Sequence, residues 1–130
     1  MITLPTNVRR LIDGVNYAHI ATVLPDGGPH SVPLWVEMEG DHIAVLTSPK
    51  SRKARNLDRD PRVAISMTDH AQPYAMAWVR GRVARRLEDD DALEVIDRLS
   101  VKYTGQPYPL RTDRVVFLIE PEHADAVAYG

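Results

Sequence analysis

The sequence contains no cysteine, which excludes disulfide bonds, thiolate metal sites and cysteine nucleophiles. No apolar run approaches the roughly 20 residues of a membrane-spanning helix, and the N-terminus lacks the apolar core of a signal peptide. A surplus of one charge is also missing, since 16 Lys and Arg face 18 Asp and Glu, and this argues against a general nucleic-acid coat protein. We therefore expect a cytoplasmic domain whose partners include neither a membrane nor a nucleic acid.

The chain has the length and composition of one folded domain. Its 130 residues fall within the usual domain size, and this length can bury a single core. With 44% hydrophobic and 26% charged residues, the composition is that of a folded chain and not of a disordered one. We expect one domain over residues 1–130.

Short β-branched runs separated by turn residues predict strands along most of the chain. The turns Pro25–Gly28 and Glu39–Asp41 join the first three runs as an antiparallel meander. Strands are predicted at Tyr17–Leu24, His30–Met38, His42–Thr47, Arg62–Thr68, Tyr74–Leu87, Val115–Glu120 and, as a short seventh, Ala124–Tyr129. Apolar spacing and capping residues predict helices at Thr3–Asp13, from an N-cap at Ser48 to about Asp60, and at Asp89–Tyr103.

Two residues inside the predicted strands indicate where the sheet is irregular. Pro33 has no N–H for the strand ladder, so its strand should lie at an edge or contain a bulge. Gly81 should form a bulge or bend in the long strand around it. Six or seven strands with three helices and no strand–helix alternation exclude a parallel dinucleotide-binding sheet. The predicted fold class is mainly β, a small antiparallel β-barrel with peripheral helices.

The residue types of common catalytic and metal sites occur without the spacing that those sites need. None of the serines stands in the glycine-flanked turn of a hydrolase nucleophile. No two of the five histidines are four residues apart, as a helical metal site requires. We interpret the histidines as surface or barrel-end residues and predict no metal site.

A basic segment runs from Lys50 to Arg62, with six Lys or Arg and two Asp. The helix predicted there carries Lys50, Arg52 and Lys53 in its first turn, where the helix dipole is already positive and each cation costs about 0.3–1 kcal/mol. Free N–H groups, the dipole and three cations together describe a site for an anion, most simply a phosphate. A solvated basic helix explains the same residues, and composition alone favours neither interpretation.

The order of these segments resembles the flavin-binding split barrels. The resemblance is carried by HSVPLWV after the Pro-Asp-Gly-Gly turn, by TSPKSRKARNLDRDPRVAISM, and by a long strand ending in WVRGRV. It covers about Leu11–Pro121, and its most specific part is the motif Ser51–Lys53 followed by Asn56–Leu57 and Asp60–Pro61. The superfamily includes pyridoxamine 5′-phosphate oxidase and a branch that uses the deazaflavin coenzyme F-420. The resemblance implies a homodimer of six-stranded split β-barrels with the cofactor in the groove between subunits.

The resemblance also assigns cofactor-binding roles to residues in four short stretches. The residues implied are Ser31, Pro33, Leu34, Trp35, Thr47, Ser48, Ser51, Arg52, Lys53, Asn56, Met76, Ala77 and Trp78. Arg52 and Lys53 would bind the phosphate within a pocket lined by the nearby hydroxyls, and the strand from Ser31 would run along the ring, largely through its backbone. The stretch 76–78 would come from the partner subunit and close the groove. Asn56 has a polar contact in helix packing as its alternative role, and each tryptophan has the core or the dimer interface.

Differences from the pyridoxamine-phosphate oxidases direct the functional prediction. Residues 31–36 supply no cation to a phosphate, Met76 stands where those enzymes have a glutamine, and their C-terminal Trp and Arg signature is absent. The sequence resembles more closely the small F-420-dependent members, which reduce unsaturated substrates by hydride transfer. We therefore predict an F-420-dependent oxidoreductase acting on a small unsaturated organic molecule. An FMN-dependent oxidoreductase, a non-catalytic flavin or haem carrier, and a structural dimer module are the alternatives.

The residue that would donate a proton in such a reaction is not identified by the sequence. No side chain stands out as a general acid, so the proton is expected from solvent. Tyr74, Tyr103 and Tyr108 are candidates on condition that they reach the groove.

Overall fold

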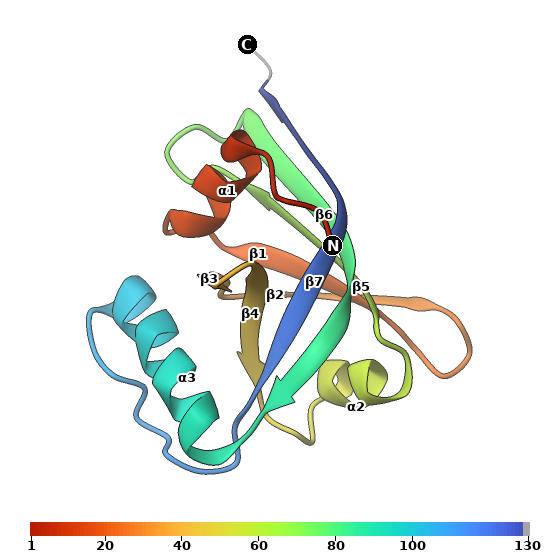
Figure 1. Cartoon of the computed structure of the whole chain (residues 1–130), viewed down its shortest axis with the longest axis vertical. Coiled ribbons are helices and arrows are strands. Elements are labelled where there is room, and N and C mark those ends of the chain that lie inside the picture. The colour runs from red at the N-terminus through yellow and green to blue at the C-terminus, as the bar shows by residue number, and fades with distance from the viewer. Residues whose placement is uncertain (129–130) are drawn as a thin grey trace.

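Seven strands and three helices make up residues 1–128, the part of the chain that this computed structural model describes (Figure 1). The strands are β1 (Ala18–Val23), β2 (Pro29–Leu34), β3 (Glu37–Glu39), β4 (His42–Thr47), β5 (Arg62–Thr68), β6 (Ala75–Leu87) and β7 (Val115–Ala128). The helices are α1 (Thr6–Asp13), α2 (Arg52–Arg59) and α3 (Asp89–Thr104). All seven strands form one antiparallel sheet in the order β2-β1-β5-β6-β7-β4-β3.

The connection between β2 and β3 requires this sheet to curl. These strands lie at opposite ends of the sheet order, yet only Trp35 and Val36 separate them in the chain. Three Cα–Cα steps span at most about 11 Å, so the two ends of the sheet must come together. The sheet is therefore a barrel that is split between β2 and β3, and it confirms the predicted mainly-β barrel with peripheral helices.

Two apolar clusters hold the barrel and its helices together. The inner cluster fills the barrel, and α1 and α2 each turn an apolar face toward it. The outer cluster lies between α3 and the other face of β4 and β7. On β7, Val115, Phe117 and Ile119 belong to the inner cluster, whereas Val116 and Leu118 belong to the outer one. Because both faces of β7 are covered, its first five residues are all buried, and each contributes about 1.5–3 kcal/mol on burial.

Most predicted strands keep their boundaries, but the strand predicted at His30–Met38 is wrong. It is two strands, because the backbone of Val36 is held by the end of α3: Tyr103 Oη accepts from its N–H at 3.2 Å, and Lys102 Nζ donates to its carbonyl at 2.8 Å. The expected meander is accordingly two hairpins, β1–β2 and β3–β4, at opposite ends of the sheet. Pro33 does lie on an edge strand, as predicted.

The two strands predicted after residue 114 are one continuous strand as far as the structure describes it. β7 runs through Pro121 to Ala128, and Tyr129 lies outside the described residues. Pro121 is accommodated opposite Gly81, where the register shifts as predicted, so the missing N–H falls at an irregular point of the ladder. A Cβ atom at Gly81 would lie 2.1 Å from the carbonyl oxygen of Glu120, so glycine is required for this close approach.

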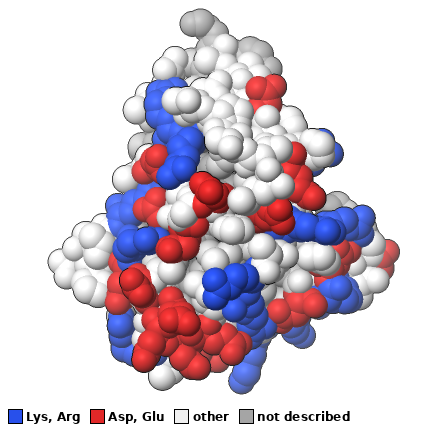
Figure 2. Space-filling view, viewed as in Figure 1, with Lys and Arg blue, Asp and Glu red and all other residues white. Residues whose placement is uncertain are grey.

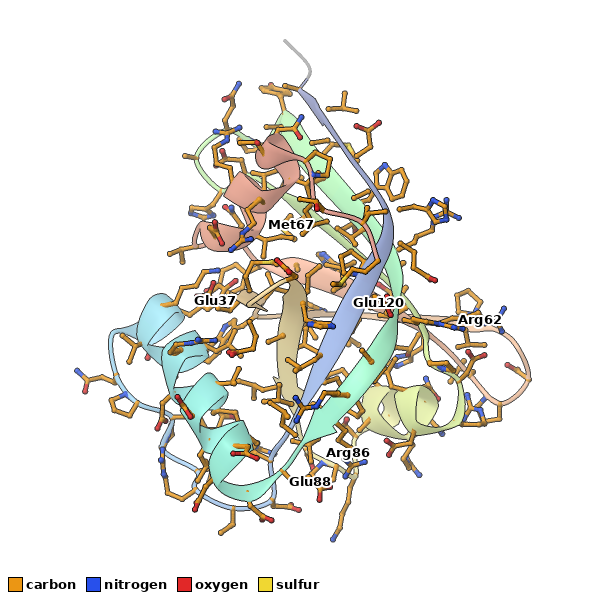
Figure 3. The ribbon with its side chains drawn as sticks, viewed as in Figure 1. Glu37, Arg62, Met67, Arg86, Glu88 and Glu120 are labelled. Atoms are coloured by element: carbon orange, nitrogen blue, oxygen red, sulfur yellow. The ribbon has the colours of Figure 1, made fainter. Side chains whose placement is uncertain are left out.

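Helix α2 begins three residues later than the sequence predicted. Its N-cap is Ser51, whose Oγ accepts a hydrogen bond from the N–H of Ala54 at 3.1 Å, and the predicted cap Ser48 lies in the preceding turn with Pro49. The other end of α2 is tied to the sheet, because Arg86 of β6 pairs with Asp58 at 2.7 Å. Arg86 also pairs with Glu88 at 3.0 Å, and both of these side chains are labelled in Figure 3. The helix is therefore capped at its start and joined to β6 near its end.

Candidate functional site

The start of α2 gathers hydroxyl groups and cations from the predicted phosphate motif. Thr47, the last residue of β4, donates from Oγ1 to the Oγ of Ser51 at 2.9 Å, which fixes the turn between strand and helix. The first turn of α2 contains Arg52 and Lys53 and no acidic residue. The positive end of the helix dipole and two cations therefore share one place, an arrangement that stabilises a bound anion.

Arg52 is oriented by a buried chain of polar groups. Its Nε donates to Asn56 Oδ1 at 3.1 Å, and the Nδ2 of Asn56 donates to Thr22 Oγ1 of β1 at 3.0 Å. Asn56 is completely buried, and Thr22 is 2% exposed. Asn56 therefore makes the helix-packing contact that the sequence offered as its alternative role, and its side chain orients Arg52.

Lys53 is half-buried and lacks a carboxylate partner among residues 1–128. Burial lowers the pKa of its amino group, and the charge of Arg114 lowers it further. Both effects disfavour the ammonium form in the free protein, and an anion bound beside it would oppose them.

On the face shown in Figure 2, acidic side chains gather over the start of α3, and elsewhere both signs are interspersed.

The outer face of the sheet carries two adjoining grooves of about 380 Å³ each. One is lined by Ser31 and Trp78, and the other by Gly81, while Ala21 and Ala64 line both. The structure therefore brings two of the predicted site residues, Ser31 and Trp78, together within one chain. Beside Trp78, Ala77 is fully buried in the barrel interior, so its side chain does not reach either groove.

A third, aromatic pocket of about 180 Å³ lies on the other side of the end of β2. It is lined by Leu34, Trp35, Leu46 and Tyr108, and Leu46 directly precedes Thr47 in β4. The indole of Trp35 meets the Tyr108 ring edge-on, with 6.3 Å between their centroids. The pocket has the size for a small planar molecule.

Tyr103 supports this pocket and is not free to act as an acid. Its ring stacks on Trp35 at 5.1 Å with an angle of 5° between the planes. Its hydroxyl donates to the carbonyl of Asn16 at 2.6 Å, and burial raises its pKa. Of the three tyrosines considered from sequence, Tyr74 is 68% exposed and Tyr108 is the one that lines a described pocket.

Sequence reasoning missed two contributors to this region, Leu46 and Arg114. Leu46 looked like any apolar strand residue, and only the position of α3 shows that it faces outward into the aromatic pocket. Arg114 stood at the end of a polar loop with no local motif around it.

Among the described residues, no group of three His, Asp or Glu side chains is placed to hold a metal ion. None of the helices in residues 1–128 is long and apolar enough to cross a membrane.

Comparison with known proteins gives consistent matches over nearly the whole chain. The model of a family described as pyridoxamine 5′-phosphate oxidase matches residues 4–128. A solved structure named an F-420 reductase is 30% identical, with a TM-score of 0.82, and the match covers 94% of this chain and 98% of that one. The comparison with curated proteins found no match.

Two more distant solved structures share the fold. A conserved hypothetical protein from Mycobacterium tuberculosis is 23% identical, with a TM-score of 0.82 over 98% of this chain and 86% of that one. General Stress Protein 26 from Bacillus anthracis is 20% identical, with a TM-score of 0.71 over 93% and 91% of the two chains.

Proposed function

The chain belongs to the pyridoxamine 5′-phosphate oxidase family, and from this premise we propose that it is an oxidoreductase that uses coenzyme F-420. In this proposal a hydride passes between the deazaflavin and a small unsaturated organic substrate. The solved structure named an F-420 reductase, which matches 94% of this chain at 30% identity, supports the choice of cofactor. FMN is the alternative cofactor.

The observation that carries this proposal is the cation pair at the start of α2. Arg52 and Lys53 stand at the positive end of a helix without carboxylate partners among the described residues, and Arg52 is held in place by buried Asn56. A phosphate accepts hydrogen bonds from such groups and satisfies their charge. F-420 carries a phosphodiester and a polyglutamate tail, so a basic segment as long as Lys50–Arg62 suits it better than the single phosphate of FMN.

The proposed roles of the chain are to bind, to orient and to exclude water. Arg52, Lys53 and the hydroxyl of Ser51 would hold the phosphate, with Ser51 fixed by the hydrogen bond from Thr47. The strand from Ser31 to Trp35 would lie along the ring, and the cofactor, when bound, supplies the hydride. The aromatic pocket would hold the substrate beside it, with apolar walls that exclude water. The proton would come from solvent or, since it lines the pocket, from the hydroxyl of Tyr108.

A homodimer belongs to this proposal. The grooves on the outer face of the sheet are lined in part by the small residues Ala21, Ala64 and Gly81, which permit the close approach of a second subunit. The partner would contribute Met76 and Trp78 to the cofactor groove and bury more than roughly 2,000 Å² in total. Light scattering at micromolar concentration should find a dimer, and Ala64→Glu should give a folded monomer. A monomeric wild-type protein would contradict the shared groove.

The experiment that tests the function separates the cofactors before it measures turnover. F-420, FMN and haem are added singly to the protein, affinities are measured, and the loaded protein is then assayed for reduction of enone substrates. F-420 should bind most tightly and support turnover. Equal or tighter binding of FMN would favour the FMN enzyme, and tight binding without turnover on any substrate would favour a carrier.

A further inference from the structure

Arg114 lies directly before β7, the strand that pairs with β4 next to the anion site. It directly precedes Val115, and Val115 pairs with Thr47, whose hydroxyl is bonded to the N-cap Ser51. The last residue before β7 and the first turn of α2 are thus brought together by the β4–β7 ladder, although Lys53 and Arg114 are far apart in sequence.

The guanidinium of Arg114 is fixed but unpaired. Its Cζ lies 5.7 Å from the centroid of the Tyr108 ring, a cation–π contact, and its Nη1 donates to the carbonyl of Asp113 at 3.1 Å. Its Nε is buried and has no hydrogen-bond partner among the described residues. No carboxylate of residues 1–128 forms an ion pair with it.

Other arginines of the chain show what a purely structural arginine does in this fold. Arg62, Arg86 and Arg111 each pair with an aspartate at 2.7 Å. Arg114 has instead a second cation as its neighbour, since its charge acts on half-buried Lys53. Two partly buried cations repel one another, and their unused N–H donors need acceptors. A bound anion meets both needs, because it supplies negative charge and acceptor oxygens.

We propose that Arg114 is an anion-binding residue, and that with Lys53 it holds a phosphate group of the bound cofactor. The anion site stands on the surroundings of these two cations, whereas the identity of the molecule that carries the phosphate rests on the proposed function. The planar guanidinium is kept in place by Tyr108, and its Nη2 forms none of the hydrogen bonds found among the described residues, so it can donate to a phosphate oxygen. Tyr108 also lines the aromatic pocket, so the phosphate and the proposed substrate pocket would lie on either side of one tyrosine.

The test uses inorganic pyrophosphate as the probe and Arg114→Gln as the variant. Arg10→Gln is the matched control, because Arg10 is an exposed arginine of α1 without an ion pair among the described residues. Isothermal titration calorimetry should show pyrophosphate binding to the wild type, a dissociation constant at least tenfold higher for Arg114→Gln, and a change below twofold for Arg10→Gln. Amine NMR should show the pKa of Lys53 rising in Arg114→Gln alone.

The outcomes separate this inference from the proposed function. Unchanged pyrophosphate affinity in Arg114→Gln, or no pyrophosphate binding by the wild type, would overturn the role of Arg114. Pyrophosphate binding that depends on Arg114, without binding of F-420 or FMN, would support the anion site and remove the proposed function. Arg114→Lys keeps the positive charge and loses the planar guanidinium. A folded Arg114→Lys protein with intermediate affinity therefore supports the inference even where the glutamine variant does not fold. Wild-type affinity in Arg114→Lys together with an unfolded glutamine variant would assign Arg114 a structural role and overturn it.

Discussion

Two lysines that are partly removed from solvent, one at the start of α2 and one near the end of α3, differ in the partners of their amino groups. Burial lowers the pKa of both Lys53 and Lys102. Lys102 donates to the carbonyls of Ile12 at 2.5 Å and Val36 at 2.8 Å, and Glu37 lies 3.9 Å away and favours its charge. Lys53 has a cation, Arg114, where Lys102 has acceptors. Burial alone therefore does not distinguish the two lysines, and the missing acceptors around Lys53 are what support its proposed role in binding an anion.

The largest expected effect comes from removing Lys102, the lysine whose amino group has hydrogen-bond acceptors. Lys102→Met should lower the free energy of unfolding by about 2–4 kcal/mol, because two carbonyls of the chain lose a charged donor. Urea denaturation measures the change, and Lys53→Met is the matched variant, expected to stay within about 0.5 kcal/mol of the wild type or to gain stability. Equal losses in both variants would mean that the two lysines have the same structural role.

Removing the unsatisfied lysine should affect binding in place of folding. Lys53→Ala should weaken cofactor binding by about 1.5–3 kcal/mol, the value of a charge-assisted contact, or roughly 10- to 150-fold in the dissociation constant. Fluorescence titration with F-420 measures this. Lys50→Ala is the internal control, since Lys50 is exposed and lies before the Ser51 cap. Equal and negligible losses in both variants would favour the solvated-helix interpretation.

The hydrogen bonds from Arg52 through Asn56 to Thr22 allow the same comparison of paired and unpaired groups for uncharged side chains. Thr22→Val keeps the shape of the side chain but leaves the buried Nδ2 of Asn56 without its acceptor, which should cost about 1–2 kcal/mol of stability. Thermal unfolding measures it, with Thr68→Val on the exposed face of β5 as the control. Affinity for the cofactor should fall less than in Lys53→Ala, because Arg52 loses only its orientation. A stability unchanged from wild type would show that Asn56 has another acceptor.

The smallest effect concerns pH. Because the pKa of Lys53 lies below 10.5 in the folded chain, the unfolded chain binds more protons between the two values, and stability should rise with pH in that window. Cofactor affinity should fall in the same window as the amine loses its charge. NMR titration of both lysines should show that bound pyrophosphate raises the pKa of Lys53 and leaves that of Lys102 unchanged. Lys53→Arg should remove the pH dependence of binding, and its persistence would assign the dependence to another group.

The parts of the site that the sequence predicts are those carried by one turn of chain. Ser51, Arg52 and Lys53 are adjacent, so their chemistry and the helix dipole can be read together without knowing the fold. Arg114 joins them only through the pairing of Thr47 with Val115, and no local pattern specifies that pairing.

The fold shows the same division between local and distant causes. The boundaries of β4 and β5 follow from their own β-branched runs and flanking turns, and they are as predicted. The break between β2 and β3 follows from Lys102 and Tyr103, more than 60 residues away, which hold the Val36 backbone. The sequence around Val36 favours an extended strand, and the tertiary contacts override it.

The sheet order separates the assembly of the barrel into early and late steps. The hairpins β1–β2, β3–β4 and β5–β6 join neighbours in the chain, whereas β7 supplies the strand between β6 and β4 from the last part of it. A nascent chain that ends before Val115 therefore exposes the open edges of β4 and β6 at once, both apolar on at least one face. Protection of these edges from intermolecular pairing therefore depends on the synthesis of β7.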